Sequence, residues 1–114
     1  MNAYNPMQQL PSKDWLELSQ SGRQERITNY LEAQGERAEN LVRQALSILA
    51  VENQLALGNQ AVMDALARLT AQGMNRLMAL QKIGNLYWKY ETEKLRPHPD
   101  AIDFESYEFD LNTF

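Results

Sequence analysis

A heptad repeat of apolar residues runs through most of this 114-residue chain. Counting from Ile27 to Tyr90 in alternating steps of four and three residues gives nineteen positions, which we call the seam. Fourteen seam positions are apolar or aromatic, whereas 44% of the whole chain is hydrophobic. A repeat of 3.5 residues keeps one side of a helix against a partner helix, so the sequence predicts an all-α, coiled-coil-like fold. The five exceptions are Gln34, Glu52, Asn59, Gly73 and Arg76.

The helical pattern covers residues 22–95 without a proline. Its best candidate for a break is the pair Gly58 and Asn59, because glycine is preferred just past a helix end and asparagine is a strong N-cap. We therefore expect a long antiparallel helical hairpin made of residues 22–57 and 60–95, each helix ~54 Å long. The alternative is a single long helix in a parallel coiled coil, which the unbroken register of the seam favours.

Proline and capping signals divide the chain into three parts. Ser12 is a possible cap for a short helix whose Trp15 needs a place to bury, and Ser21 with Gln24 forms an S-x-x-Q capping box that predicts the next helix start. We expect an N-terminal arm with a short helix at residues 1–21, a helical body at residues 22–95, and a proline-containing spacer with an acidic docking tail at residues 96–114.

The apolar stripe is wider than a two-stranded coiled coil requires near the middle of the body. Val42, Leu46 and Leu49 form a second row beside the seam. A wide stripe buries against more than one neighbouring element. We therefore predict that these three residues form an interface of a homo-oligomer or of a larger assembly.

The C-terminal tail combines acidic and large apolar side chains. Residues 1–96 hold eleven basic and ten acidic residues, a balance of +1, whereas residues 97–114 hold five acids and no base, a balance of −5. A tail that stays free in solution has no use for so many apolar side chains. We expect it to dock on a protein partner, and Trp88, which lies off the seam, to be a second anchor. The predicted docking residues of the tail are Phe104, Tyr107, Phe109, Leu111 and Phe114.

The tail is compatible with two registers, and the sequence leaves both open. As a helix it would place Phe104, Tyr107, Leu111 and Phe114 on one face. As an added strand it would use Tyr107, Phe109 and Leu111 on alternate positions.

An acidic C-terminus that ends in phenylalanine is similar to the partner-recruiting tails of single-stranded-DNA-binding proteins. The resemblance covers only the last few residues of the chain, which include residues 110–114. The predicted helical body lacks the β-barrel of those proteins, so their function is not carried over.

No catalytic, cofactor or metal site is predicted. The chain has no cysteine, which excludes disulfides and thiolate metal sites, and its one histidine, His98, lies between two prolines in the spacer. No glycine-rich phosphate loop is present. The nearly neutral body lacks the concentrated basic face that nucleic acids require. We therefore expect a non-enzymatic protein with no cofactor, no metal and no nucleic-acid partner.

The N-terminal residues lack the basic start and apolar run of a signal peptide, and the most apolar stretch is too short to cross a bilayer. We expect a protein without a membrane span that is cytoplasmic or part of a macromolecular assembly. The predicted function is that of a structural protein that oligomerises through its body and docks its tail on a neighbouring subunit, as in a virion or secretion apparatus. The alternative is a small helical adaptor, chaperone or inhibitor that binds one partner through the tail.

Overall fold

The computed structural model describes residues 4–8, 10–93, 107 and 110–114. This part of the chain confirms the all-α prediction. It contains five helices: α1 (Ser12–Glu17), α2 (Gln20–Ala33), α3 (Ala38–Ala56), α4 (Gln60–Ala71) and α5 (Arg76–Glu93).

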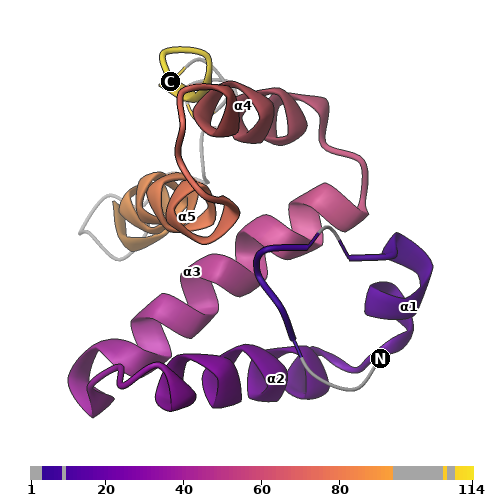
Figure 1. Ribbon diagram of the computed structural model, residues 1–114, viewed down its shortest axis with the longest axis vertical. Helices are drawn as coiled ribbons and strands as arrows, with labels where there is room; N and C mark the ends of the chain where they lie inside the picture. Colours follow the sequence, from indigo (N-terminus) through magenta and orange to yellow (C-terminus); the bar gives the residue numbers. More distant parts are fainter. Residues whose placement is uncertain (1–3, 9, 94–106, 108–109) are drawn as a thin grey trace.

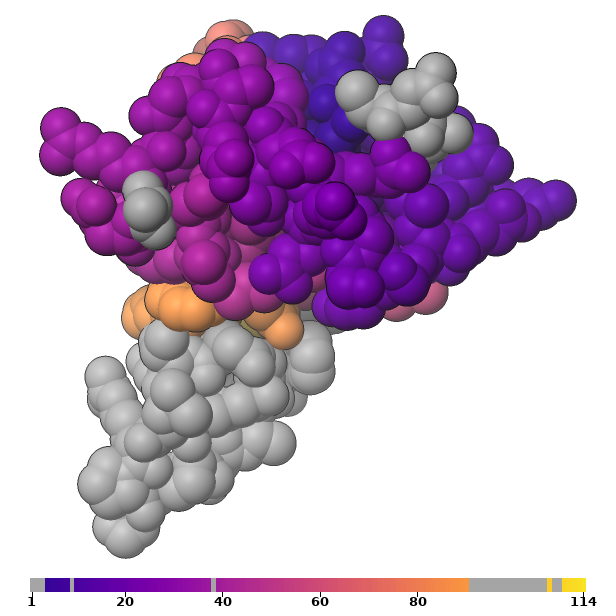
Figure 2. Space-filling view, turned by 90° about the horizontal axis from the view of Figure 1, so that it is seen from below, coloured from indigo at the N-terminus to yellow at the C-terminus, as the bar shows by residue number. Residues whose placement is uncertain are grey.

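Helix α3 lies at the centre and contacts each of the other four helices (Figure 1). Helix α2 folds back along α3 on one side, and α5 crosses α3 on the other side, with α4 packed against α5. Seen from the side of α2, the N-terminal half of the chain forms one broad face, and α5 emerges at its edge (Figure 2). None of the described helices is long and apolar enough to cross a membrane.

Three glycine turns separate the four longer helices. Gly35, Gly58 and Gly73 have φ angles of 86°, 80° and 96°, a left-handed conformation that glycine adopts without a steric penalty. After each glycine, the next residue donates its N–H to the carbonyl five residues earlier, for example Glu36 to Leu31 at 3.0 Å. This pattern is the Schellman motif, which satisfies the last carbonyls of a helix.

These turns correct the predicted hairpin. The break at Gly58 is where the sequence predicts it, and the Asn59 side chain caps α4 by accepting a hydrogen bond from the Val62 N–H at 3.1 Å. The two long helices predicted on either side do not occur, because Gly35 ends α2 and Gly73 ends α4 with the same motif. The single long helix is excluded for the same reason.

The start of α2 differs by two residues from the predicted capping box. Ser19, rather than Ser21, is the N-cap, and its hydroxyl accepts a hydrogen bond from the Gly22 N–H at 3.0 Å. Ser12 is the first residue of α1, whose N-cap is Pro11, without a capping bond from its side chain.

The seam supplies half of the sixteen buried hydrophobic residues of the core, although its helices are shorter than predicted. Eight of its apolar residues are buried. They are Ile27, Leu31, Ala45, Ile48, Val62, Leu69, Leu80 and Ile83. Where α3 and α5 cross, Gly84 lies so close to Ser47 that a Cβ on residue 84 would stand 2.9 Å from the Ser47 Cβ. The close crossing therefore depends on the absence of a side chain at Gly84.

Candidate functional site

The described part of the tail is docked on its own chain. Tyr107 and Leu111 are fully buried. The Tyr107 ring makes edge-to-face contacts with Tyr87 and Tyr90, with centroids 5.8 and 5.9 Å away. Its hydroxyl donates a hydrogen bond of 2.9 Å to Oε1 of Gln54 on α3. The Tyr107 side chain therefore contacts both α3 and α5.

Two cations hold the end of this turn. The Arg68 guanidinium donates from Nη2 to the Leu111 carbonyl at 2.7 Å and from Nε to the Phe114 carbonyl at 3.0 Å. The Lys82 Nζ lies 5.1 Å from the centre of the Phe114 ring, and the Tyr90 hydroxyl donates a hydrogen bond to the Asp110 carboxylate. A cation near the C-terminal carbonyls of a helical turn is favourable. We call the set Gln54, Arg68, Lys82, Tyr87 and Tyr90 the tail-binding surface.

The helical register agrees with the described residues, since Tyr107, Asp110 and Leu111 have helical backbone. Phe104, Phe109 and His98 lie outside the described residues. The contribution of Phe109, which would separate the two registers, is therefore not tested. The structure shows the tail on its own body. Docking on a neighbouring subunit therefore stays a proposal.

A groove of about 480 Å³ lies beside the tail-binding surface. Its lining is mostly apolar with amide groups between, a composition typical of binding surfaces. Trp88 is half-buried at this groove, and the Arg43 guanidinium lies 5.9 Å from its ring. We call this feature the α3–α5 groove. Its lining residues are Gln20, Leu46, Leu49, Ala50, Asn53, Gln54, Leu57, Tyr87 and Trp88.

The three residues predicted to form an oligomer interface have different environments. Leu49 is only 2% exposed and packs in the core of its own chain, which removes it from the predicted interface. Leu46 is half-buried at the groove, and Val42, one helical turn earlier, is 58% exposed. Leu57, at the other end of the groove, is 73% exposed. The exposed side chains of Val42 and Leu57 therefore contribute little to the buried core of the chain.

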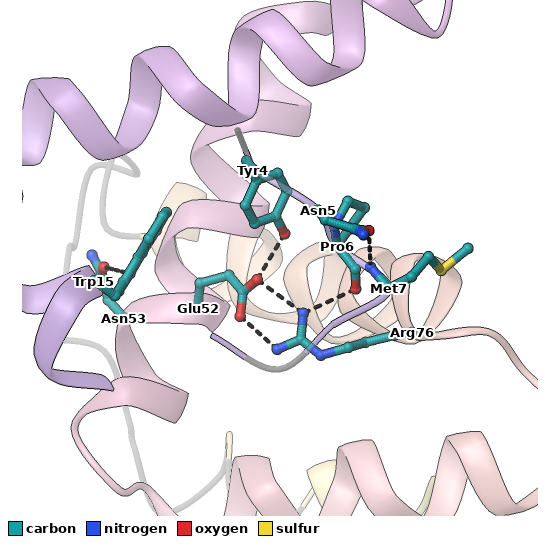
Figure 3. A network of polar contacts seen from close by, with 8 residues as sticks. All are labelled: Tyr4, Asn5, Pro6, Met7, Trp15, Glu52, Asn53 and Arg76. Atoms are coloured by element: carbon teal, nitrogen blue, oxygen red, sulfur yellow. Dashed lines mark hydrogen bonds and ion pairs between the residues drawn. The ribbon is translucent and has the colours of Figure 1, made fainter. Parts of the chain in front are cut away.

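A polar cluster is buried under the N-terminal arm, which we define as residues 4–8 (Figure 3). Arg76 donates two hydrogen bonds to the Glu52 carboxylate, at 2.8 and 3.0 Å, and one to the Pro6 carbonyl at 3.0 Å. The Tyr4 hydroxyl donates to the same carboxylate at 2.7 Å. Glu52 is 2% exposed, so its charge is compensated by a bidentate arginine and a phenol.

Burial raises the pKa of the Tyr4 hydroxyl far above its usual range, and the Glu52 carboxylate raises it further. Burial alone would lower the pKa of Arg76, but the hydrogen bonds that Arg76 donates to Glu52 and the negative charge of Glu52 outweigh burial and raise it. Tyr4 therefore stays neutral and Arg76 stays charged at neutral pH. Tyr4, Glu52 and Arg76 are hydrogen-bonded to one another, and these bonds hold the arm in place.

A second contact, on the far side of Glu52, secures α1 and α2. The Trp15 indole N–H donates to Oδ1 of Asn53 at 3.0 Å, and Arg23 donates to the same oxygen at 2.9 Å. The Trp15 ring is fully buried and lies 6.0 Å from the Tyr4 ring. The predicted burial of Trp15 is thus confirmed, and the arm and α1 share one apolar cluster.

Sequence reasoning missed two groups of residues. Arg68 and Lys82 face the tail only because α4 and α5 come together in the fold, and their sequence positions carry no signal of it. Glu52 and Arg76 did carry a signal, since both are polar exceptions on the apolar seam. Opposite charges at two core positions predict an ion pair.

Within the described ranges, no three His, Cys, Asp or Glu side chains lie together in a way that could hold a metal ion. Comparison with protein-family models, with curated proteins and with solved structures gave no match for this sequence. The α3–α5 groove and the tail-binding surface are the two features of the described residues that the sequence predictions on the apolar row and on the tail also concern.

Proposed function

We propose that this chain is a non-enzymatic assembly protein that associates with further copies of itself through the α3–α5 groove and contributes its C-terminal tail to the contact with a neighbouring subunit. The observation that carries the proposal is the apolar surface along this groove. Leu57, which lines the groove just past the end of α3, is 73% exposed, and Val42, one turn before the groove residue Leu46, is 58% exposed. Clustered exposed apolar side chains are typical of interaction sites.

The chemistry of the groove supports a second copy as the occupant. Val42 and Leu46 on α3 and Leu57 at its C-cap have spacings that keep them on one side of the helix. The same stripe on two copies can pack around a two-fold axis, in which each residue meets its partner's complementary position. Arg43 and Trp88 at the edge are residue types that supply anchors in protein interfaces.

Sedimentation equilibrium of the full chain tests the proposal. We expect the wild-type protein to self-associate and the double variant Val42→Asp, Leu57→Asp to be monomeric with unchanged helix content, because each charge would be buried in the interface without a partner. The matched control is Met78→Asp, an exposed apolar residue on α5 that does not line the groove and is 52% exposed.

The control variant should associate as the wild type does. A wild-type chain that stays monomeric at every concentration would overturn the proposal. It would instead favour a small helical adaptor that binds one partner through its tail.

A further inference from the structure

We propose that the tail-binding surface of one copy takes the C-terminal segment of a second copy, so that neighbouring chains exchange these segments. The inference rests on the proposed function, because it needs two copies held together at the α3–α5 groove. It goes further by naming the receptor for the tail. The C-terminal segment is here Tyr107 together with residues 110–114.

The contacts of the segment do not depend on its being part of the same chain. Each joins groups far apart in sequence, by 53 residues between Tyr107 and Gln54 and by 43 residues between Leu111 and Arg68. Side-chain burial, hydrogen bonds to carbonyl oxygens and ring contacts form equally well between two molecules. Exchange of an identical element between copies preserves every contact and is a common route to dimers.

The surface recognises a short and specific pattern. It buries an aromatic residue and a leucine four positions later, which are Tyr107 and Leu111. It also contacts the carboxylate of Asp110, directly before the leucine, and the ring of Phe114, three residues after the leucine and beside Lys82. A second copy supplies the same pattern, and its acidic tail matches the positive charges of Arg68 and Lys82.

The tail-binding surface and the α3–α5 groove are contiguous. Gln54 accepts the Tyr107 hydrogen bond and also lines the groove, and Tyr87 both contacts the Tyr107 ring and lines the groove. Two copies that meet at the groove therefore bring each tail-binding surface next to the other chain. This closeness raises the effective concentration of the neighbouring segment toward that of the chain's own segment.

The covalent length of the chain permits the exchange. Thirteen residues, 94–106, separate the end of α5 from Tyr107. A chain of that length can span at most ~45 Å. The longest dimension of the protein is 40 Å, so the segment of one chain has enough connecting residues to reach the adjacent body.

A complementation experiment with two full-length variants tests the exchange. The donor chain keeps its tail and carries Arg68→Glu, which removes the two hydrogen bonds to the carbonyls of Leu111 and Phe114 and places a negative charge against them. The acceptor chain keeps Arg68 and carries Tyr107→Ala with Leu111→Ala. Its matched control carries the tail substitutions and Arg68→Glu together. The donor is labelled with a fluorophore at Asn112→Cys, an exposed position in a chain without natural cysteines.

Fluorescence-detected sedimentation then gives the dissociation constant of the donor for each acceptor. All three chains have the same groove, so groove contacts contribute equally to both dissociation constants. The difference between the two constants therefore reports the binding of the tail alone. We expect the donor to bind the acceptor at least about tenfold more tightly than it binds the control, as loss of charge-assisted hydrogen bonds implies.

Equal measurable affinity for the acceptor and the control would overturn the exchange and leave the proposed function in place. Absence of association with either would overturn both. Circular dichroism checks that the variants are folded. If Arg68→Glu does not fold, Arg68→Gln replaces it in the donor and the control, and the same affinity difference decides.

Discussion

The two ends of the chain are fastened to the same helix in parallel ways. A tyrosine hydroxyl from each end donates to a side-chain oxygen on α3, Tyr4 to Glu52 and Tyr107 to Gln54. An arginine from another helix then donates to main-chain carbonyls of each end, Arg76 for the N-terminal arm and Arg68 for the C-terminal segment.

The acceptors differ in charge and burial. Glu52 is ionisable, almost fully buried and paired with Arg76, whereas Gln54 is neutral and half-buried at the edge of a groove. Displacing the arm would remove the Tyr4 hydrogen bond from a buried carboxylate, and a hydrogen bond to a charged group is worth more than one between neutral groups. Displacing the C-terminal segment would leave a neutral amide that water can reach. The comparison indicates that the arm is a permanent part of the core and that the segment is the releasable end.

The largest effect should come from breaking the ion pair under the arm. We expect Arg76→Met to lower the free energy of unfolding by about 3–5 kcal/mol, because the buried Glu52 carboxylate loses its counter-charge. Urea unfolding followed by circular dichroism measures the loss. The double variant Glu52→Leu, Arg76→Met should recover most of it, since replacing both charges by apolar groups leaves no buried charge. A loss below about 1 kcal/mol for Arg76→Met would show that the arm is no more firmly held than the C-terminal segment.

An intermediate effect should come from removing the tyrosine anchor of the C-terminal segment. Tyr107→Ala should lower the local opening free energy of the segment by up to about 3 kcal/mol while the body keeps its stability. Native-state hydrogen exchange measures both, through the amides of Thr113 and Phe114, which are bonded within the segment, and through those of α3.

Asn112→Ala is the control for this variant, because Asn112 is exposed and its loss should change stability by less than about 0.5 kcal/mol. Faster exchange throughout α3 in Tyr107→Ala would mean that the segment and the body unfold together, and the contrast between the two ends would disappear.

The smallest effect, and one that depends on pH, should come from Tyr4→Phe. At neutral pH the loss of one hydrogen bond to a charged group should lower stability by about 1.5–3 kcal/mol or less, since Arg76 still pairs with Glu52. The pKa of Tyr4 is raised in the folded state above its ordinary value of 10.0, so its stabilising contribution is fully present below that pH and is lost as the pH rises above it.

Above pH 10.0 the wild type should therefore lose stability relative to Tyr4→Phe by about 1.4 kcal/mol per pH unit. Urea unfolding of both proteins between pH 7 and 11 measures the difference. Two curves that stay parallel over this range would show that Tyr4 ionises as easily in the folded protein as in the unfolded chain.

The polar exceptions on the seam explain how much of the fold the sequence could predict. Glu52 and Arg76 are the buried ion pair, and Asn59 is the N-cap of α4. Gln34 and Gly73 stand where α2 and α4 end. Each interruption of the apolar pattern therefore marks a helix end or a core contact. The apolar positions predicted the core because burial depends on which side of a helix a residue occupies, whatever the length of that helix.

The helix lengths could not be predicted in the same way. The turns at Gly35 and Gly73 leave the heptad phase unchanged, so periodicity alone does not reveal them, whereas the Asn59 cap identified the turn at Gly58. The candidate site was predicted in part. Tyr107 and Leu111 were identified from their apolar spacing, but Arg68 and Lys82 depend on the tertiary arrangement of α4 and α5. Leu49 belonged to the core rather than to an interface, because α3 is covered on more sides than a hairpin would cover it.

The three glycine turns also bear on the rates of folding and unfolding. Each turn joins two helices that are adjacent in sequence, and the pairs α2–α3, α3–α4 and α4–α5 pack against each other, so these contacts can close quickly, whereas α3 and α5 meet across the intervening α4. The two ends make long-range bonds, 70 residues apart between Pro6 and Arg76 and 53 between Tyr107 and Gln54, and such bonds form late. Contacts absent from the folding transition state govern how fast a protein unfolds. The contacts of the two ends would therefore mainly set the rate of unfolding. The contacts within the helical body would mainly set the rate of folding.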